Sequence, residues 1–180
     1  QIYFASQNKH GDWARVTPFE HNDRSYSIAH PALDEPGTVL IFSSNMPGGH
    51  GGADLYYSKL KADSTWSKPV NLGDKINTEG NEDFPFLSDD GKTLYFASNG
   101  YPGLGGYDVY KTEWDQKTNN WKSPQNLGYP LNSSYDDKVI QFSDDMKHAY
   151  LTAVRPEGYG DRDIYRVTLE EVEKKPALFI

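Results

Sequence analysis

The stretch WSKPVNLG at residues 66–73 returns as WKSPQNLG at residues 121–128, 55 positions further along the chain. A repeat of this period predicts an architecture in which equivalent units pack side by side and bury a continuous core. In such a protein we expect function on the surface that the units form together, and not in one local motif.

Other landmarks share this register. A strand-like run has three copies, LIFSSN (40–45), LYFASN (94–99) and AYLTAV (149–154). An Asp-x-Tyr core also occurs three times, at intervals of 54 and 55 residues, at Asp54, Asp108 and Asp163. The acidic turn SDDGK (88–92) recurs as SDDMK (143–147). Because several independent landmarks share one period, the units are copies of one structural motif.

The N-terminal residues are predicted to form a damaged unit. IYFAS (2–6) is similar to LYFAS (94–98), and Trp13 stands in the place of Trp66. On this alignment, about one hairpin is missing between Ser6 and Trp13.

Each complete unit is predicted to contain four strands, because its runs are short and rich in aromatic and β-branched residues. In the best copy the expected strands are 84–87, 93–98, 107–114 and 121–126. Only 169–175 suggests a helical turn or a linker. A radially repeated four-stranded unit predicts an all-β fold, a β-propeller. A solenoid is the alternative, although solenoid repeats are usually shorter.

The propeller repeats are expected to cover residues 1–169. They divide into a partial blade and three further blades, at 1–32, about 33–86, 87–140 and 141–169. Closed propellers have about four to eight blades, so we expect an incomplete segment of a longer protein. Residues 170–180 are predicted to be a linker and the start of a following domain. Sheet edges at the ends of an open arc predict association of the isolated segment.

Composition excludes several classes of function. The net charge is −8 and the pI is about 5.0. This acidic balance argues against binding to nucleic acids or anionic membranes, because both require a basic protein surface. No run approaches the length of a membrane span. The absence of cysteine excludes disulfides, thiolate metal sites and a cysteine nucleophile.

The repeated aspartates are the first candidates for a site. A ring formed by Asp54, Asp108 and Asp163 would suit a cation such as Ca²⁺. Alternatively, each carboxylate accepts backbone N–H groups within its own glycine-rich turn. Recurrence in every unit favours this structural role, and we assign Trp66 and Trp121 to the same class of structural repeat positions. The five histidines show no metal-ligand spacing, so no metal site is expected.

Long glycine-rich loops lie at 47–52, 102–106 and 158–160. They lack the helix N-terminus and lysine of a phosphate cradle, so no nucleotide or other cofactor is expected. The aromatic residues near them, with one histidine, are candidates for a partner-binding surface or for packing between blades: His50, Tyr101, Tyr107 and Tyr159. The acidic pairs 82–83 and 136–137 either face a central channel or lie in solvated turns.

The combined pattern LYFASN, GGYDVY, W-x-x-P-x-N-L-G and SDDGKTLYF resembles the WD-like propeller repeat related to TolB. In particular it looks like the version in OmpA-family envelope proteins of Bacteroidetes, some of which resemble the envelope component of type IX secretion and gliding. The resemblance covers residues 30–169. The resemblance implies a periplasmic, outer-membrane-associated scaffold without enzymatic activity, whose partners are other envelope proteins. Contact with peptidoglycan would need a domain that these residues do not contain.

Three functions follow from a propeller of this kind. The first is a non-catalytic interaction module that docks partners through loop tips. The second is a propeller-fold glycosidase, which needs unique paired carboxylates near the axis; acids that recur at equivalent turns count against it. The third is the accessory propeller of a peptidase, with the catalytic domain elsewhere.

Overall fold

The computed structural model describes residues 1–144 and 146–169, which form strands and turns without any helix. Within this part of the chain there is accordingly no helix long and apolar enough to cross a membrane. The all-β class predicted from the repeat is confirmed.

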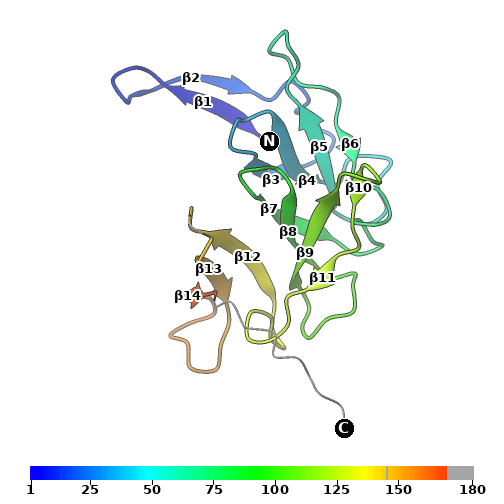
Figure 1. Ribbon diagram of the computed structural model, residues 1–180, viewed down its shortest axis with the longest axis vertical. Coiled ribbons are helices and arrows are strands. Elements are labelled where there is room, and N and C mark those ends of the chain that lie inside the picture. The colour runs from blue at the N-terminus through cyan, green and yellow to red at the C-terminus, as the bar shows by residue number, and fades with distance from the viewer. Residues whose placement is uncertain (145, 170–180) are drawn as a thin grey trace.

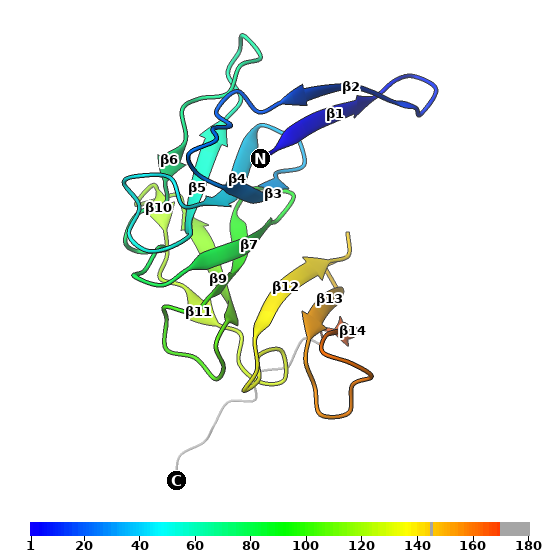
Figure 2. The same ribbon diagram turned by 180° about the vertical axis from the view of Figure 1, so that it is seen from behind.

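The strands form four antiparallel sheets (Figures 1 and 2). The first contains β1 (Tyr3–Gln7) and β2 (Trp13–Pro18). The second contains β3 (Ile28–Leu33), β4 (Val39–Ser44), β5 (Asp54–Lys59) and β6 (Val70–Asn71). The third contains β7 (Glu82–Leu87), β8 (Thr93–Ser98), β9 (Asp108–Asp115), β10 (Asn120–Trp121) and β11 (Gln125–Asn126). The fourth contains β12 (Asp137–Phe142), β13 (His148–Ala153) and β14 (Asp163–Thr168).

The sheets follow one another in chain order, each packed against the next. β3 and β4 lie against β7, while β12 lies against β7, β8 and β9. Within each sheet the order is up and down, because neighbouring strands are joined by hairpins. Figures 1 and 2 show the sheets in an open arc, with the chain passing from one to the next. This is the arrangement of an incomplete β-propeller.

Two predicted strand boundaries need correction. β7 begins at Glu82 rather than at residue 84, and β9 is shifted by one residue to Asp108–Asp115. The predicted strand 121–126 is divided into β10 and β11, which both pair with β9. Pro124 lies in the interruption, where it has no N–H to offer to a ladder.

The second, third and fourth sheets cover residues 28–71, 82–126 and 137–168. The predicted blade borders at 33, 87 and 141 therefore fall within or at the end of the first strand of each sheet. Polar turns follow residues 33 and 87. Such a turn instead joins the first two strands of one sheet: Asp34 accepts hydrogen bonds from the Thr38 and Val39 amides, at 2.6 and 2.8 Å. The connections between sheets are the loops after the last strands.

The assignment of residues 2–6 to a second strand is wrong, because β1 and β2 are the third and fourth strands of a unit. An asparagine recurs every 55 residues, at Asn22, Asn77 and Asn132. Each side chain hydrogen-bonds both the amide and the carbonyl of one residue: Asn22 binds Ile2, Asn77 binds Leu55 and Asn132 binds Val109. Ile2 is thus equivalent to Leu55 at the third strand. Trp13 pairs with Gln7 just as Trp66 pairs with Leu60, so no hairpin is missing.

The core consists of apolar layers between successive sheets. Ile41 and Leu55 on the second sheet pack with Phe96, Tyr110 and Trp121 on the third. All five side chains are at least nine-tenths buried. The equivalent layer one sheet earlier contains Trp66, whose ring stacks on Phe4 with centroids 5.4 Å apart. The repeated tryptophans therefore lie in packing layers between sheets.

The outer face of the last sheet is exposed at positions that are buried in the other sheets. Tyr150 is 48% exposed and Ile164 is 74% exposed. The residues one repeat earlier, Tyr95 and Val109, are 8% and 0% exposed because β12–β14 cover them. At the other end of the arc, Trp13 is likewise 71% exposed. Both ends therefore present the faces that adjacent blades cover inside the arc.

We expect residues 1–180 to self-associate through these end faces, and Ile164→Lys to shift sedimentation velocity profiles towards the monomer. A lysine on this face opposes apolar burial without disturbing the packed side of the sheet. Leu104→Lys, at a 55% exposed loop residue, is the matched control and should leave the profile unchanged. A well-folded wild-type monomer at all concentrations would contradict the prediction.

Candidate functional site

The repeated aspartates lie at the glycine-rich loops and bind the backbone of those loops. Asp54 accepts hydrogen bonds from the His50 amide at 2.5 Å, the Gly51 amide at 3.1 Å and the Asn71 side chain at 2.8 Å. A Cβ at Gly49 would lie 2.4 Å from the Asp54 carboxylate, so this loop requires glycine. The carboxylate thus holds the loop closed over the start of β5.

The same arrangement recurs in the next two sheets. Asp108 accepts from the amides of Leu104 and Gly105, at 2.5 and 3.3 Å, and Asp163 accepts from the Tyr159 amide at 2.8 Å. Each aspartate therefore binds within its own loop. Among the residues that the structure describes, no group of three or more acidic or histidine side chains could hold a metal ion.

The four candidate partner-binding residues do not form one surface. Tyr101 packs on Phe96 and Tyr110 and donates its hydroxyl to the Lys75 carbonyl at 2.7 Å. Burial raises the pKa of Tyr101 to about 12. The half-buried Tyr107 lies under the Lys138 ammonium. His50 and Tyr159 are exposed, the latter fully, but they belong to loops of different sheets.

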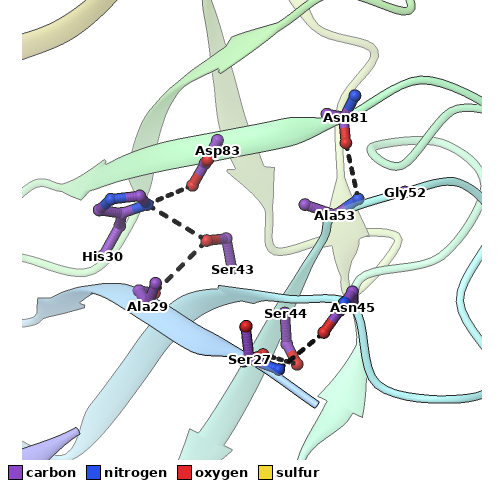
Figure 3. A pocket seen from close by; sticks show the side chains of 10 residues that line it. All are labelled: Ser27, Ala29, His30, Ser43, Ser44, Asn45, Gly52, Ala53, Asn81 and Asp83. Carbon is purple, nitrogen blue, oxygen red and sulfur yellow. Dashed lines mark hydrogen bonds and ion pairs between the residues drawn. The ribbon is translucent and has the colours of Figure 1, made fainter. Parts of the chain in front are cut away.

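A cavity of about 350 Å³ opens between the second and third sheets (Figure 3). It is bordered by the start of β3, the end of β4, the start of β5 and the start of β7. It is lined by small residues and by residues with polar side chains, which are Ser27, Ala29, His30, Ser43, Ser44, Asn45, Gly52, Ala53, Asn81 and Asp83. The cavity lies beside the end of the β4–β5 loop, which supplies Gly52 and Ala53 to its lining.

A hydrogen bond between two side chains joins the two sheets across this cavity. His30 Nδ1 lies 2.5 Å from Asp83 Oδ1, and the two side chains point toward one another in Figure 3. The His30 ring stacks on Phe84, with centroids 4.0 Å apart. Both residues have positive φ, 49° and 50°, at equivalent bulges in β3 and β7. Sequence reasoning missed this pair, although the His-Pro and Phe-Pro dipeptides 54 residues apart mark the equivalent bulges.

The geometry of the pair does not suit nucleophilic catalysis. Ser43 Oγ also approaches His30 Nδ1, at 3.4 Å. A catalytic serine relay needs its acid on one ring nitrogen and the serine on the other. Because Asp83 and Ser43 share Nδ1, the imidazole is not placed to take a proton from Ser43 onto Nε2. The arrangement orients polar groups around a cavity.

The acidic pairs at 82–83 and 136–137 were predicted to face a channel or solvent, and this is wrong for one member of each. Glu82 and Asp137 are fully buried. Glu82 accepts hydrogen bonds from the hydroxyls of Thr78 and Ser98, at 2.7 and 2.6 Å. Asp137 binds Arg155. The strands start with these side chains turned into the sheet, which leaves Asp83 and Asp136 at the surface between sheets.

Burial raises the pKa of Glu82 above its ordinary value of 4.5, against the lowering effect of Ser98 and Thr78. The folded state therefore binds this proton more tightly than the unfolded state does. We expect wild type to gain stability relative to Glu82→Gln as the pH falls from the raised pKa towards 4.5. The change is at most about 1.4 kcal/mol per pH unit.

Urea unfolding of both proteins across this pH range measures the difference. Glu79→Gln, at an exposed glutamate in the same loop, is the control for the change of surface charge. A stability difference between wild type and Glu82→Gln that stays constant with pH would show that Glu82 titrates alike in both states.

No known protein family matches the sequence, and no curated protein matches it. The fold does match solved structures. TolB from Acinetobacter baumannii aligns with a TM-score of 0.52 and 14% identity, over 92% of this chain and 37% of TolB. An oligogalacturonate lyase in complex with manganese aligns with a TM-score of 0.46 and 14% identity, over 93% of this chain and 41% of the lyase. A prolyl endopeptidase aligns with a TM-score of 0.44 and 16% identity, over 88% of this chain and 22% of the endopeptidase.

The alignment with TolB shows that this chain has a TolB-like β-propeller fold. The chain spans little more than a third of the length of TolB, in agreement with an incomplete propeller.

Proposed function

We propose that this chain is a non-catalytic interaction module of a bacterial cell-envelope protein. The observation that carries the proposal is the cavity between the second and third sheets. It is open, and hydrogen bonds between the two sheets hold the side chains of His30, Asp83 and Asn81 at its border (Figure 3). A preformed recess that combines apolar surface with a few placed polar groups suits binding of a partner's side chain.

Support for the envelope comes from the sequence. The repeat resembles that of OmpA-family envelope proteins of Bacteroidetes, and the fold is that of TolB. We propose a periplasmic, outer-membrane-associated scaffold, related to the type IX secretion and gliding proteins, whose partners are other envelope proteins. Contact with peptidoglycan would belong to a domain outside these residues.

The glycosidase alternative has less support from the geometry. Such an enzyme needs two carboxyl groups that face the scissile bond. At the cavity, Asp83 is bound to His30 and Glu82 is fully buried between Thr78 and Ser98. A scaffold requires no free carboxyl pair, and it uses the same residues to fix the shape of the recess.

Site-specific photo-crosslinking in envelope fractions tests the proposal. A benzophenone side chain at His50, in the same loop as the cavity-lining Gly52, is compared with one at Lys117, in the exposed β9–β10 turn. We expect a discrete adduct with an envelope protein from position 50 and not from position 117. Equal adducts from both positions would contradict the proposal. So would glycoside hydrolysis that Asp83→Asn abolishes.

A further inference from the structure

The interface between the third and fourth sheets contains an internal template for what the cavity holds. Ala53 at the cavity and Tyr107 are equivalent, 54 residues apart. The Ala53 amide donates to Asn81 Oδ1 at 3.0 Å, and the Tyr107 amide donates to Asp136 Oδ1 at 3.1 Å. The backbone is therefore held in the same way at both places, and the two interfaces differ in the side chain.

Tyr107 places its ring between two sheets. Lys138 of β12 lies over this ring, with Nζ 4.2 Å from the centroid. Burial raises the pKa of Tyr107, and the carboxylates of Asp83 and Asp136 add to this rise, so its hydroxyl lies in a partly buried acidic environment. In the preceding interface Ala53 supplies no ring, and a cavity of about 350 Å³ is present beside it. This volume lies within the range of about 300–1,000 Å³ that is usual for ligand sites.

The charge beside the missing ring is reversed. The residue equivalent to Lys138, 55 positions earlier, is Asp83. The cation that covers the Tyr107 ring is thus replaced by a carboxylate at the cavity. With a net charge of −8, the whole chain also favours approach of a positively charged partner.

We propose that the cavity at Ala53 receives a tyrosine side chain from a positively charged segment of a partner protein. The ring takes the place that Tyr107 fills in the next interface, and a basic neighbour of the tyrosine lies near Asp83, whose Oδ1 also contacts His30 Nδ1. This inference rests on the proposed docking function and names the chemistry of the partner.

Capped tripeptides test the proposal with the full chain. Lys-Tyr-Lys is titrated into ¹⁵N-labelled protein, with Lys-Ala-Lys and Glu-Tyr-Glu as comparisons. We expect Lys-Tyr-Lys to shift the amide signals of Gly52, Ala53 and Asn81, with binding about tenfold tighter than that of either comparison. Equal binding of Lys-Tyr-Lys and Lys-Ala-Lys would overturn the proposal, because charge alone would then explain the contact.

The variant Ala53→Tyr supplies the ring from the chain itself. It installs the residue that occupies the equivalent backbone position at 107, and filling the cavity should raise the melting temperature. We expect this variant to bind Lys-Tyr-Lys about tenfold more weakly than wild type. Ala62→Tyr adds the same ring at an exposed turn and should bind as wild type does.

Peptide binding that persists in Ala53→Tyr would overturn the proposed tyrosine site. A second result would also overturn the tyrosine site: Lys-Tyr-Lys fails to bind wild type, while folded Ala53→Tyr protein still forms the crosslink from position 50. The proposed docking function would then stand without the tyrosine site. If the otherwise wild-type protein forms no crosslink from position 50 and wild type binds no peptide, the proposed docking function is contradicted as well.

Discussion

Arg155→Met is expected to lower the free energy of unfolding by about 3–5 kcal/mol, the usual cost of removing one partner of a buried ion pair. Arg155 Nη1 lies 2.8 Å from Asp137 Oδ1, and their side chains are 14% and 0% exposed. Arg155 also donates to the Leu131 carbonyl at 3.0 Å. The variant therefore leaves a buried carboxylate without its cation at the start of the fourth sheet.

The other sheets show how the same position is stabilised without an ion pair. The residues equivalent to Asp137 and Arg155 are Ile28 and Met46 in the second sheet, both packed in an apolar cluster. We therefore expect the double variant Asp137→Ile, Arg155→Met to recover most of the stability lost in the single variant. Replacing both members of a buried pair by apolar residues is often neutral or stabilising.

Urea unfolding measured by tryptophan fluorescence and circular dichroism provides the comparison. Arg162→Met is the matched control, because Arg162 is half exposed and lies 3.9 Å from Asp136. We expect its cost to stay below about 1 kcal/mol. A double variant as unstable as Arg155→Met alone would show that Arg155 acts through its carbonyl contacts and not through Asp137.

The sequence was sufficient to predict the repeat, the approximate places of most strands and the propeller class. The octet at 66–73, with its copy at 121–128, contains residues that the second and third sheets use in the same way. Its tryptophan packs between sheets, and its asparagine donates to the repeated aspartate, from Asn71 to Asp54 and from Asn126 to Asp108. A residue needed once in each sheet leaves a periodic signal, and such signals are readable without a structure.

The features that sequence reasoning missed are those in which one unit departs from the others. Alanine at position 53 carries no motif, yet the cavity follows from its difference from Tyr107. Glu82 and Asp137 resembled solvated turn residues, and their burial depends on partners 16 and 18 residues away, Ser98 and Arg155. The N-terminal strand was misassigned because exposed residues such as Tyr3 and Ser6 are compatible with any strand of the unit.

Asn132→Ala is expected to lower the free energy of unfolding. The expected cost is about 1–3 kcal/mol for each of the two backbone groups, the Val109 amide and the Val109 carbonyl, that lose their hydrogen-bond partner. The Asn132 side chain accepts from the Val109 amide at 2.8 Å and donates to the Val109 carbonyl at 2.9 Å. Both residues are fully buried, so water does not replace these bonds. The amide also donates to Asn126 Oδ1 at 2.7 Å, which connects it to the Asp108 loop.

The equivalent substitution at the N-terminal end tests whether the cost depends on burial of the two backbone groups. Asn22 makes the same two bonds, to the Ile2 amide and carbonyl at 2.9 and 2.6 Å, but the site is only partly buried. Solvent reaches these groups when the side chain is removed, so we expect Asn22→Ala to cost about 1 kcal/mol or less. Asn77→Ala, at a buried copy, should match Asn132→Ala. Equal costs at all three positions in urea unfolding would show that the asparagines stabilise the fold independently of burial, and the unsatisfied-backbone explanation would then fail.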